Sequence, residues 1–174
     1  MADSREIPEV SDAFGRQVAI TIAIFAVTLA FIGSKGDNAK TDAILKTSEA
    51  SNKWGYYQAK SVKQNLSESE GRLLSLLPAG PDEAARTAAI AKTASEALRL
   101  DAEKDEIKIE AEKLVTEAEH NSRINDRCGN GALGLQIGIV ICSVAILSKW
   151  RPLWFAGMAT GIIGITIGAT AFFM

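Results

Sequence analysis

The sequence is poor in the residues that build most catalytic and metal sites. Among its 174 residues there is a single histidine, His120, and there are only two cysteines, Cys128 and Cys142. This pair of isolated cysteines is neither a disulfide framework nor a metal motif. The chain also contains no glycine-rich phosphate loop and no Ser/His/Asp set. We therefore expect a protein that is not an enzyme, with no catalytic residues, no metal site and no cofactor.

An excess of charge of either sign is also missing. The chain has 19 Lys and Arg against 21 Asp and Glu, so that its formal net charge is −2. A nucleic-acid-binding protein needs clustered basic side chains to neutralise phosphates. We therefore expect no nucleic-acid partner.

Charged residues are absent from three long apolar runs. A helix needs roughly 17–25 mostly apolar residues to cross the hydrocarbon layer of a membrane. We predict transmembrane helices over residues 17–34, 131–148 and 153–174, with the lipid bilayer as a partner. A polar tail, residues 1–16, precedes the first run and mixes acidic with basic residues. This is not the basic start of a secretory signal, and so we expect an uncleaved anchor.

The segment between the first two runs, residues 35–128, is rich in strong helix formers. One stretch, "LLPAGPDEAA", interrupts it with Pro78, Gly80 and Pro81. Proline and glycine end one helix there, and the acidic residues that follow begin another. The sequence therefore predicts an all-α fold in which three transmembrane helices are joined by a long, coiled-coil-like antiparallel helical hairpin with its turn at 77–82. The expected arms are Asn38–Leu77 and Asp82–Arg127.

Heptad spacing supports packing between the two arms. In the second arm Leu100, Ile107 and Leu114 recur every seven residues, and Ala111 and Ala118 extend the stripe. The first arm has a weaker stripe in two related phases, which consists of Leu45, Ala59, Leu66 and Leu73 together with Val62 and Leu76.

The segment "SNKWGYYQAKSVKQ" places three aromatic residues in an otherwise polar part of the first arm. With a turn near residues 79–80, residue i of the first arm faces roughly residue 159 − i of the second. Trp54 then lies near Asp105, and Tyr57 near Ala102.

Two interpretations of this segment remain open. In the first, Trp54 and Tyr57 pack inside the hairpin, Tyr56 points elsewhere, and Lys60 faces the acidic second arm. In the second, the same four residues contact another subunit or a ligand.

Small residues in the apolar runs predict close helix packing. Glycines spaced three or four apart let helix backbones approach each other, in the same chain or in another subunit. They are Gly134 and Gly138 in the second run, and Gly157, Gly161, Gly164 and Gly168 in the third. Gln136, the strongly polar residue of the second run, is interpreted as an interhelical contact.

A short basic loop, residues 149–152, connects the last two runs. Lys149, Trp150, Arg151 and Trp154 are expected to anchor the chain at the membrane interface. Basic residues in short loops favour the cytoplasmic side, which predicts a cytoplasmic N-terminus and a periplasmic hairpin. Basic residues that flank the hairpin leave the opposite orientation open.

Three segments together resemble a bacterial membrane family known as domain of unknown function 4337: "SNKWGYYQAKSVKQNL", "EKLVTEAEHNSRIN" and "LQIGIVICSVAIL". Its members share the order of an N-terminal span, a W-x-[YF]-[YF]-Q-A-K segment, a charged helix and a C-terminal pair of spans. The chain departs from this pattern at "NDRCGNG", where relatives often carry histidine and tyrosine, so no metal site is carried over. The resemblance implies no activity.

These observations favour a non-enzymatic integral membrane protein of the bacterial inner (cytoplasmic) membrane. We expect a structural or assembly role, as a homo-oligomer or as an accessory subunit of a larger membrane complex. The alternative is a membrane sensor or regulator whose hairpin binds a ligand or a partner protein.

Overall fold

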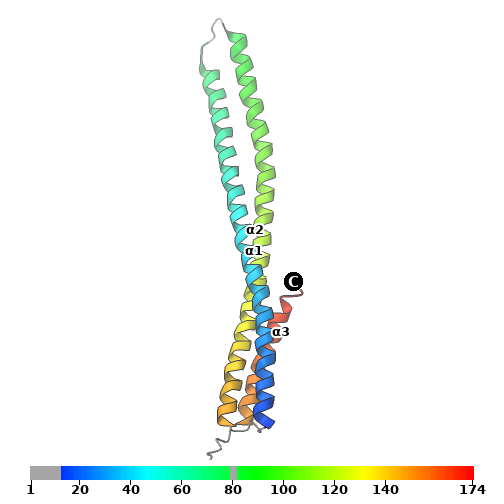
Figure 1. Ribbon diagram of the computed structural model, residues 1–174. Helices are drawn as coiled ribbons and strands as arrows, with labels where there is room; N and C mark the ends of the chain where they lie inside the picture. The colour runs from blue at the N-terminus through cyan, green and yellow to red at the C-terminus, as the bar shows by residue number, and fades with distance from the viewer. Residues whose placement is uncertain (1–12, 79–81) are drawn as a thin grey trace, which may run out of the picture. The chain divides into compact units, whose positions relative to one another are not determined.

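The computed structural model describes residues 13–78 and 82–174, and within them it contains three helices and no strand. They are α1 (Ala13–Leu76), α2 (Glu83–Ser148) and α3 (Arg151–Thr170) (Figure 1). The all-helical prediction is therefore confirmed. The tail at residues 1–12 and the centre of the expected turn, residues 79–81, lie outside the described residues.

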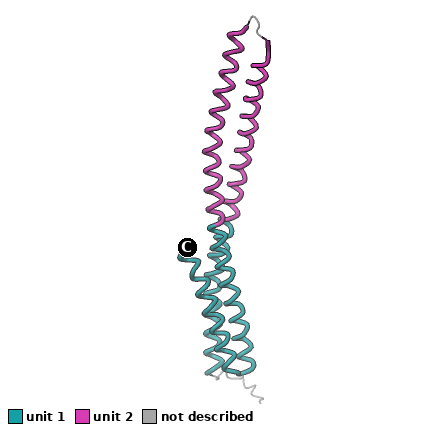
Figure 2. Tube along the Cα trace, turned by 180° about the vertical axis from the view of Figure 1, so that it is seen from behind, with its two compact units in different colours: residues 1–42, 120–174 teal, residues 43–119 magenta. Residues whose placement is uncertain are grey.

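The helices are distributed over two compact units (Figure 2). The first unit comprises residues 1–42 and 120–174, and the second comprises residues 43–119. Segments of α1 and α2 contribute to both units, whereas α3 belongs to the first alone. Each unit is described by itself below.

Both long helices run further than the expected hairpin arms. Instead of arms that begin at Asn38 and end at Arg127, α1 and α2 continue through the apolar runs without a break. The glycines in these regions cost a helix only about 1 kcal/mol each. The residues that interrupt a helix more strongly are prolines, and none lies inside α1 or α2.

The first unit is built from three helix segments that pack against one another. Its core side chains come from α1 (Phe14, Val18, Phe25 and Ile32) and from α2 (Ile124, Cys128, Leu135 and Cys142). The buried residues of α3 are all glycines. The buried face of the third helix is therefore its backbone, which packs against side chains of α1 and against side-chain and backbone atoms of α2.

In the second unit the stripe predicted for α2 faces inward. Leu100, Ile107, Ala111 and Ala118 are buried, and Leu114 is half-buried. The weaker stripe of α1 behaves in the opposite way, because its large side chains are exposed. The expectation that this stripe packs between the two arms is therefore wrong, because the stripe faces away from α2.

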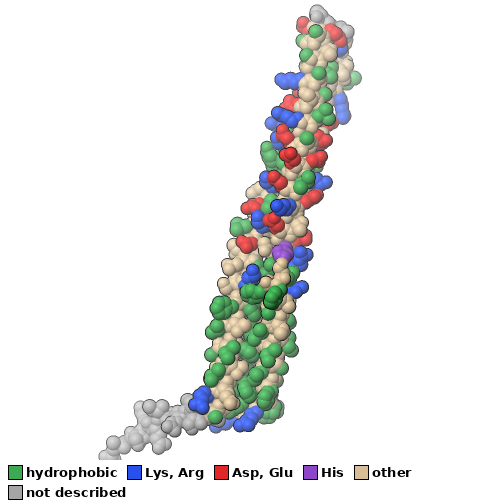
Figure 3. Space-filling model, turned by 90° about the vertical axis from the view of Figure 1, so that its right-hand side faces the viewer, with side chains coloured by type: hydrophobic (Ala, Val, Ile, Leu, Met, Phe, Trp, Pro, Cys, Tyr) green, Lys and Arg blue, Asp and Glu red, His purple; other side chains and the backbone are tan. Residues whose placement is uncertain are grey.

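Three helices in the described part of the chain are long and apolar enough to cross a membrane: α1, α2 and α3. Figure 3 shows hydrophobic side chains covering most of the visible face of the first unit, whereas charged side chains are spread over the second. Length and composition therefore indicate membrane association.

The third helix ends at Thr170, four residues earlier than the predicted span. In its last turn the N–H groups of Ala171, Phe172 and Phe173 bond to carbonyls three residues back, at 3.1 to 3.3 Å. Such tightened bonds satisfy some of the carbonyls that a helix end leaves without partners.

Candidate functional site

A ladder of ion pairs joins α1 and α2 in the second unit. Three lysines of α1, spaced by seven, meet three glutamates of α2 with the same spacing. The pairs are Lys46 with Glu117, Lys53 with Glu110, and Lys60 with Glu103. Sequence analysis missed this ladder, although the two matching columns of lysine and glutamate are visible in the sequence.

The ladder corrects the expected register between the two segments. In every pair the residue numbers add to 163, four more than the sum of 159 that was expected. The difference is about one helical turn, so the positions expected for Trp54 and Tyr57 were wrong by that amount. At the expected register Lys46 would face Lys113 and Lys60 would face Arg99. The observed register replaces these repulsive contacts with attractive ones.

Two of these ion pairs shift the pKa values of three of their members. The hydrogen bond from Lys60 to Glu103 raises the pKa of Lys60 and lowers the pKa of Glu103. In the same way, the hydrogen bond to Glu117 is the largest cause of the raised pKa of Lys46, whose Nζ lies 3.2 Å from the carboxylate. Each hydrogen bond therefore favours the charged forms.

The aromatic segment lies beside this ladder. Trp54 and Tyr57 are half-buried, and their rings meet edge to face with centroids 5.5 Å apart. Lys104 of α2 lies 5.6 Å from the centre of the Tyr57 ring. Tyr56 is exposed, and its ring lies 5.3 Å from the ammonium group of Lys60.

We call the exposed heptad face of α1 in the second unit the outer stripe. It contains no charged residue, and all ten of its positions are exposed. They are Leu45, Ser48, Asn52, Gly55, Ala59, Val62, Leu66, Ser69, Leu73 and Leu76. The opposite face, toward α2, has one heptad phase formed by Ala50, Tyr57, Gln64 and Gly71, which are buried or half-buried. The more aliphatic of the two faces is thus the one that points away from α2.

The glycines form a seam in the first unit. A Cβ added at Gly134 would lie 2.8 Å from the Cα of Gly164, and one added at Gly138 would lie 3.0 Å from the Cα of Gly161. Such distances are shorter than van der Waals contact. The glycine faces of α2 and α3 are therefore occupied by each other within one chain.

Two further glycines of α3 in this seam, Gly157 and Gly168, also contact residues of the same chain. A Cβ added at Gly157 would lie 2.6 Å from the Cys142 sulfur, and one added at Gly168 would lie 2.5 Å from Ile32 Cδ1.

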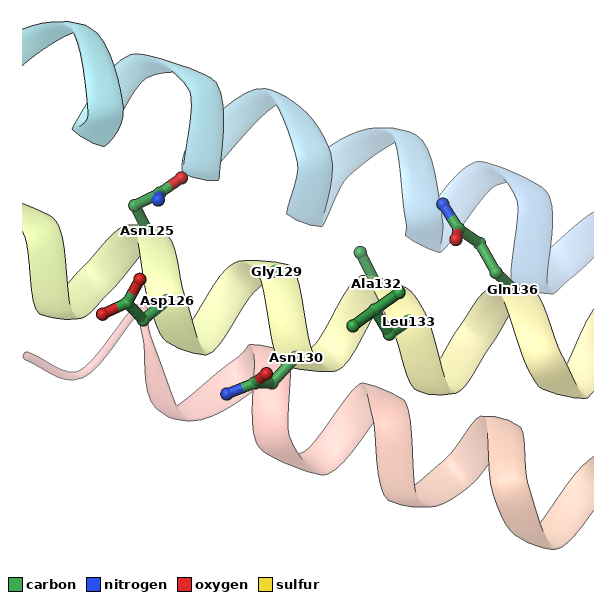
Figure 4. A pocket seen from close by; sticks show the side chains of 7 residues that line it. All are labelled: Asn125, Asp126, Gly129, Asn130, Ala132, Leu133 and Gln136. Carbon is green, nitrogen blue, oxygen red and sulfur yellow. The ribbon is translucent and has the colours of Figure 1, made fainter.

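Gln136 is exposed on α2, away from this seam. It lines an open hollow of about 590 Å³ together with Asn125, Asp126, Gly129, Asn130, Ala132 and Leu133. Figure 4 shows that all seven residues belong to α2, with Asn125 and Gln136 on the side of α1 and Asn130 on the side of α3. The hollow carries amide groups and one carboxylate, but no arrangement of a nucleophile with a base.

The expected interface residues lie at one end of the first unit. Lys149, Trp150 and Arg151 are exposed, whereas Trp154 is half-buried. The Trp154 ring meets Phe14 edge to face at 5.9 Å, and its indole N–H lies 3.4 Å from the Thr21 hydroxyl.

Basic residues also mark the other end of this unit. The Lys35 ammonium lies 5.9 Å from the centre of the Phe172 ring, and Arg127 Nη1 lies 3.3 Å from the Thr170 hydroxyl. The apolar segments of all three helices therefore lie between two basic ends.

Within residues 13–78 and 82–174, no group of three His, Cys, Asp or Glu side chains is placed to hold a metal ion. Three surface features of the described residues are candidates for a function: the outer stripe, the ion-pair ladder and the hollow on α2.

Comparison with known proteins gives one result. Residues 14–174 match the family described as "Domain of unknown function (DUF4337)", and the chain belongs to that family. The resemblance seen in the sequence is therefore confirmed. No curated protein and no solved structure matches the chain.

Proposed function

We propose that this member of the DUF4337 family is a non-enzymatic integral membrane protein with a role in assembly, as a homo-oligomer or as an accessory subunit of a larger complex. In this proposal the apolar segments of α1, α2 and α3 cross the bilayer. The 20 residues of α3 correspond to about 30 Å of helix, which is the thickness of the hydrocarbon layer. The basic residues at the two ends of the first unit support the same placement.

The second unit is proposed to be an antiparallel helical hairpin in water. The ladder supports this arrangement, because the residue numbers of its partners rise along α2 as they fall along α1. Arg86, in the first turn of α2, donates a hydrogen bond to the carbonyl of Leu77 just after α1. This contact holds the two helix ends near each other.

The exposure of the outer stripe is the observation that carries the assembly role. In the first unit, lipid would cover exposed apolar side chains such as Ile24 and Val140. No lipid would cover Leu66, Leu73 and Leu76 in the hairpin, which are 66%, 66% and 80% exposed. A row of exposed aliphatic side chains marks a protein-interaction site in a soluble region.

The proposed location is the bacterial inner membrane, with a cytoplasmic N-terminus and a periplasmic hairpin. The short connection with Lys149 and Arg151 supports this orientation, because basic residues in short loops are retained on the cytoplasmic side.

The experiment has two parts. Alkaline carbonate extraction should leave the full chain in the membrane pellet, as expected of a spanning protein. After mild detergent extraction and crosslinking, the chain should run as a discrete species larger than one chain, with itself or with other subunits. A chain released by carbonate, or one that is monomeric in native membranes and in detergent, would contradict the proposal.

A further inference from the structure

We propose that the outer stripe of α1 pairs with the outer stripe of a second copy of this chain, in parallel and in register. The inference rests on the proposed function, because two copies inserted in the same orientation in one membrane present α1 in the same direction. It adds the partner, the face and the geometry of the assembly.

The pattern of the outer stripe is that of a coiled-coil seam. Its ten positions alternate in steps of three and four, as the a and d positions of a heptad do. They extend from Leu45 to Leu76, which is more than the three to four heptads that identify a coiled coil in a sequence. The intramolecular contact with α2 uses a different face of α1, so both contacts can exist together.

The residues of the stripe favour a copy of α1 as the occupant. Leu45, Ala59, Leu66 and Leu73 share the a phase with one polar residue, Asn52. A single asparagine at an a position pairs with its own counterpart and selects a parallel, in-register arrangement. Two copies of the stripe therefore satisfy the asparagine amide, which a purely apolar partner would leave unpaired.

The flanking residues are compatible with this pairing. In a parallel dimer a g residue of one helix meets the e residue five positions later in the other helix. Gln58 then meets Lys63 of the second copy, and Asn65 meets Glu70. The pairs can form hydrogen bonds, and neither brings like charges together.

The exposed face of α2 does not offer a comparable surface. Leu98 and Ile109 are exposed there, but charged residues such as Asp105 and Glu106 lie between them. Pairing of one outer stripe with another is also isologous, so it closes at two chains and does not continue into a filament.

Disulfide crosslinking through one added cysteine, carried out in native membranes, tests the inference. In a parallel, in-register pair Leu66 meets its own counterpart, so Leu66→Cys and Leu73→Cys should each give a disulfide-linked dimer under mild oxidation. Leu98→Cys is the matched control, because this leucine is also exposed but lies on α2. The wild-type chain is the second control, since its own two cysteines are buried.

The double variant Leu66→Glu/Leu73→Glu should dissociate the dimer into monomers. Its helix content, measured by circular dichroism, should be unchanged, because both leucines are exposed. Leu98→Glu should leave the dimer intact. A variant that stays dimeric despite two glutamates on the stripe would overturn the inference.

The outcomes separate the inference from the function on which it rests. If a larger species exists but Leu66→Cys and Leu73→Cys form no dimer above the Leu98→Cys background, the inference is wrong and the assembly role stands. If the chain is monomeric under all conditions, both are wrong. Efficient dimers from the two stripe positions alone support both.

Discussion

The ring of Phe25 on α1 lies directly over Gly161 of α3. A Cβ added at Gly161 would lie 2.2 Å from the ring carbon Cε2, and so the glycine provides the space that the ring fills. Seven residues further along both helices, which is about two turns, Ile32 lies over Gly168 in the same way. Side chains of α1 thus fit into notches on α3 that only glycine leaves open.

The first prediction concerns this pair. Gly161→Ala should lower the free energy of unfolding by about 1–3 kcal/mol, because the added methyl overlaps the ring. Phe25→Leu should reduce the cost of Gly161→Ala, because the shorter side chain leaves room for the methyl. Thermal or denaturant unfolding of the four variants of a double-mutant cycle measures the coupling. Strictly additive effects would show that the two residues do not share this space.

The second prediction concerns a glycine that meets backbone atoms. A Cβ added at Gly164 would lie 2.7 Å from the Gly131 carbonyl oxygen and from the Leu135 nitrogen. Gly164→Ala should therefore be destabilising by about 1–3 kcal/mol, and Phe25→Leu should not rescue it. Gly129→Ala is the control, because no atom lies within 4 Å of its added Cβ. That variant should be neutral or more stable by up to about 1 kcal/mol. Equal losses from both substitutions would contradict the packing of α2 on α3.

The third prediction is a charge swap in the ladder. Lys60→Glu and Glu103→Lys should each lower the midpoint of thermal unfolding, because each places like charges at one rung. The double variant should recover most of the loss, since it restores an opposite pair. Circular dichroism at low salt measures both effects, and added salt should reduce them. Lys92→Glu, an exposed lysine of α2, serves as the control; a swap that fails to recover stability would argue against this register.

The fourth prediction is a pH window. Because the pKa of Glu103 is lowered, its contribution to the stability of the fold is present above the ordinary glutamate pKa of about 4.3. This contribution is lost as the pH falls through the lowered value. The raised pKa values of Lys46 and Lys60 mean that their contributions are present below about 10.4 and are lost as the pH rises through the raised values. The unfolding midpoint should therefore be highest between these limits. In a Lys60→Met/Glu103→Met variant the dependence should be weaker at both ends, and an unchanged profile would contradict the assignment.

The fifth prediction concerns the connection between α2 and α3. Lys149 has a φ of 50°, in the left-handed region that costs a residue with a Cβ roughly 1–2 kcal/mol. Lys149→Gly should remove this cost and raise the unfolding midpoint, whereas the β-branched Lys149→Val should lower it. Thermal unfolding in detergent compares the two variants with the wild type. A glycine variant that is less stable than the wild type would mean that the lysine side chain contributes more than the backbone conformation costs.

Some features of the fold followed from the sequence, whereas others needed the structure. The inward position of Leu100 and Ile107 was predictable, because large residues with heptad spacing favour a packed face. The outward position of Leu66 and Leu73 was not predictable. Periodicity gives the phase of a face around its helix but does not say which neighbour covers it.

The glycines show a similar limit. Their spacing indicated close helix approach, but Gly134 and Gly164 meet within one chain, a result that spacing alone left open. The register was missed for a different reason. It was derived from the midpoint of the turn, whereas the columns containing Lys53 and Glu110 limit the alignments in which every lysine meets a glutamate.

The column of glutamates on α2 is one residue longer than the column of lysines on α1. Glu96 lies seven residues before Glu103 and continues the column of glutamates. Sliding one segment by a heptad would therefore pair all three lysines with glutamates again, so charge by itself tolerates two alignments. The bulky edge-to-face pair of Trp54 and Tyr57 does not repeat every seven residues, and it would lose its place beside Lys104 in the slipped state. The two rings thus select one register among alignments that charge pairing alone would not distinguish.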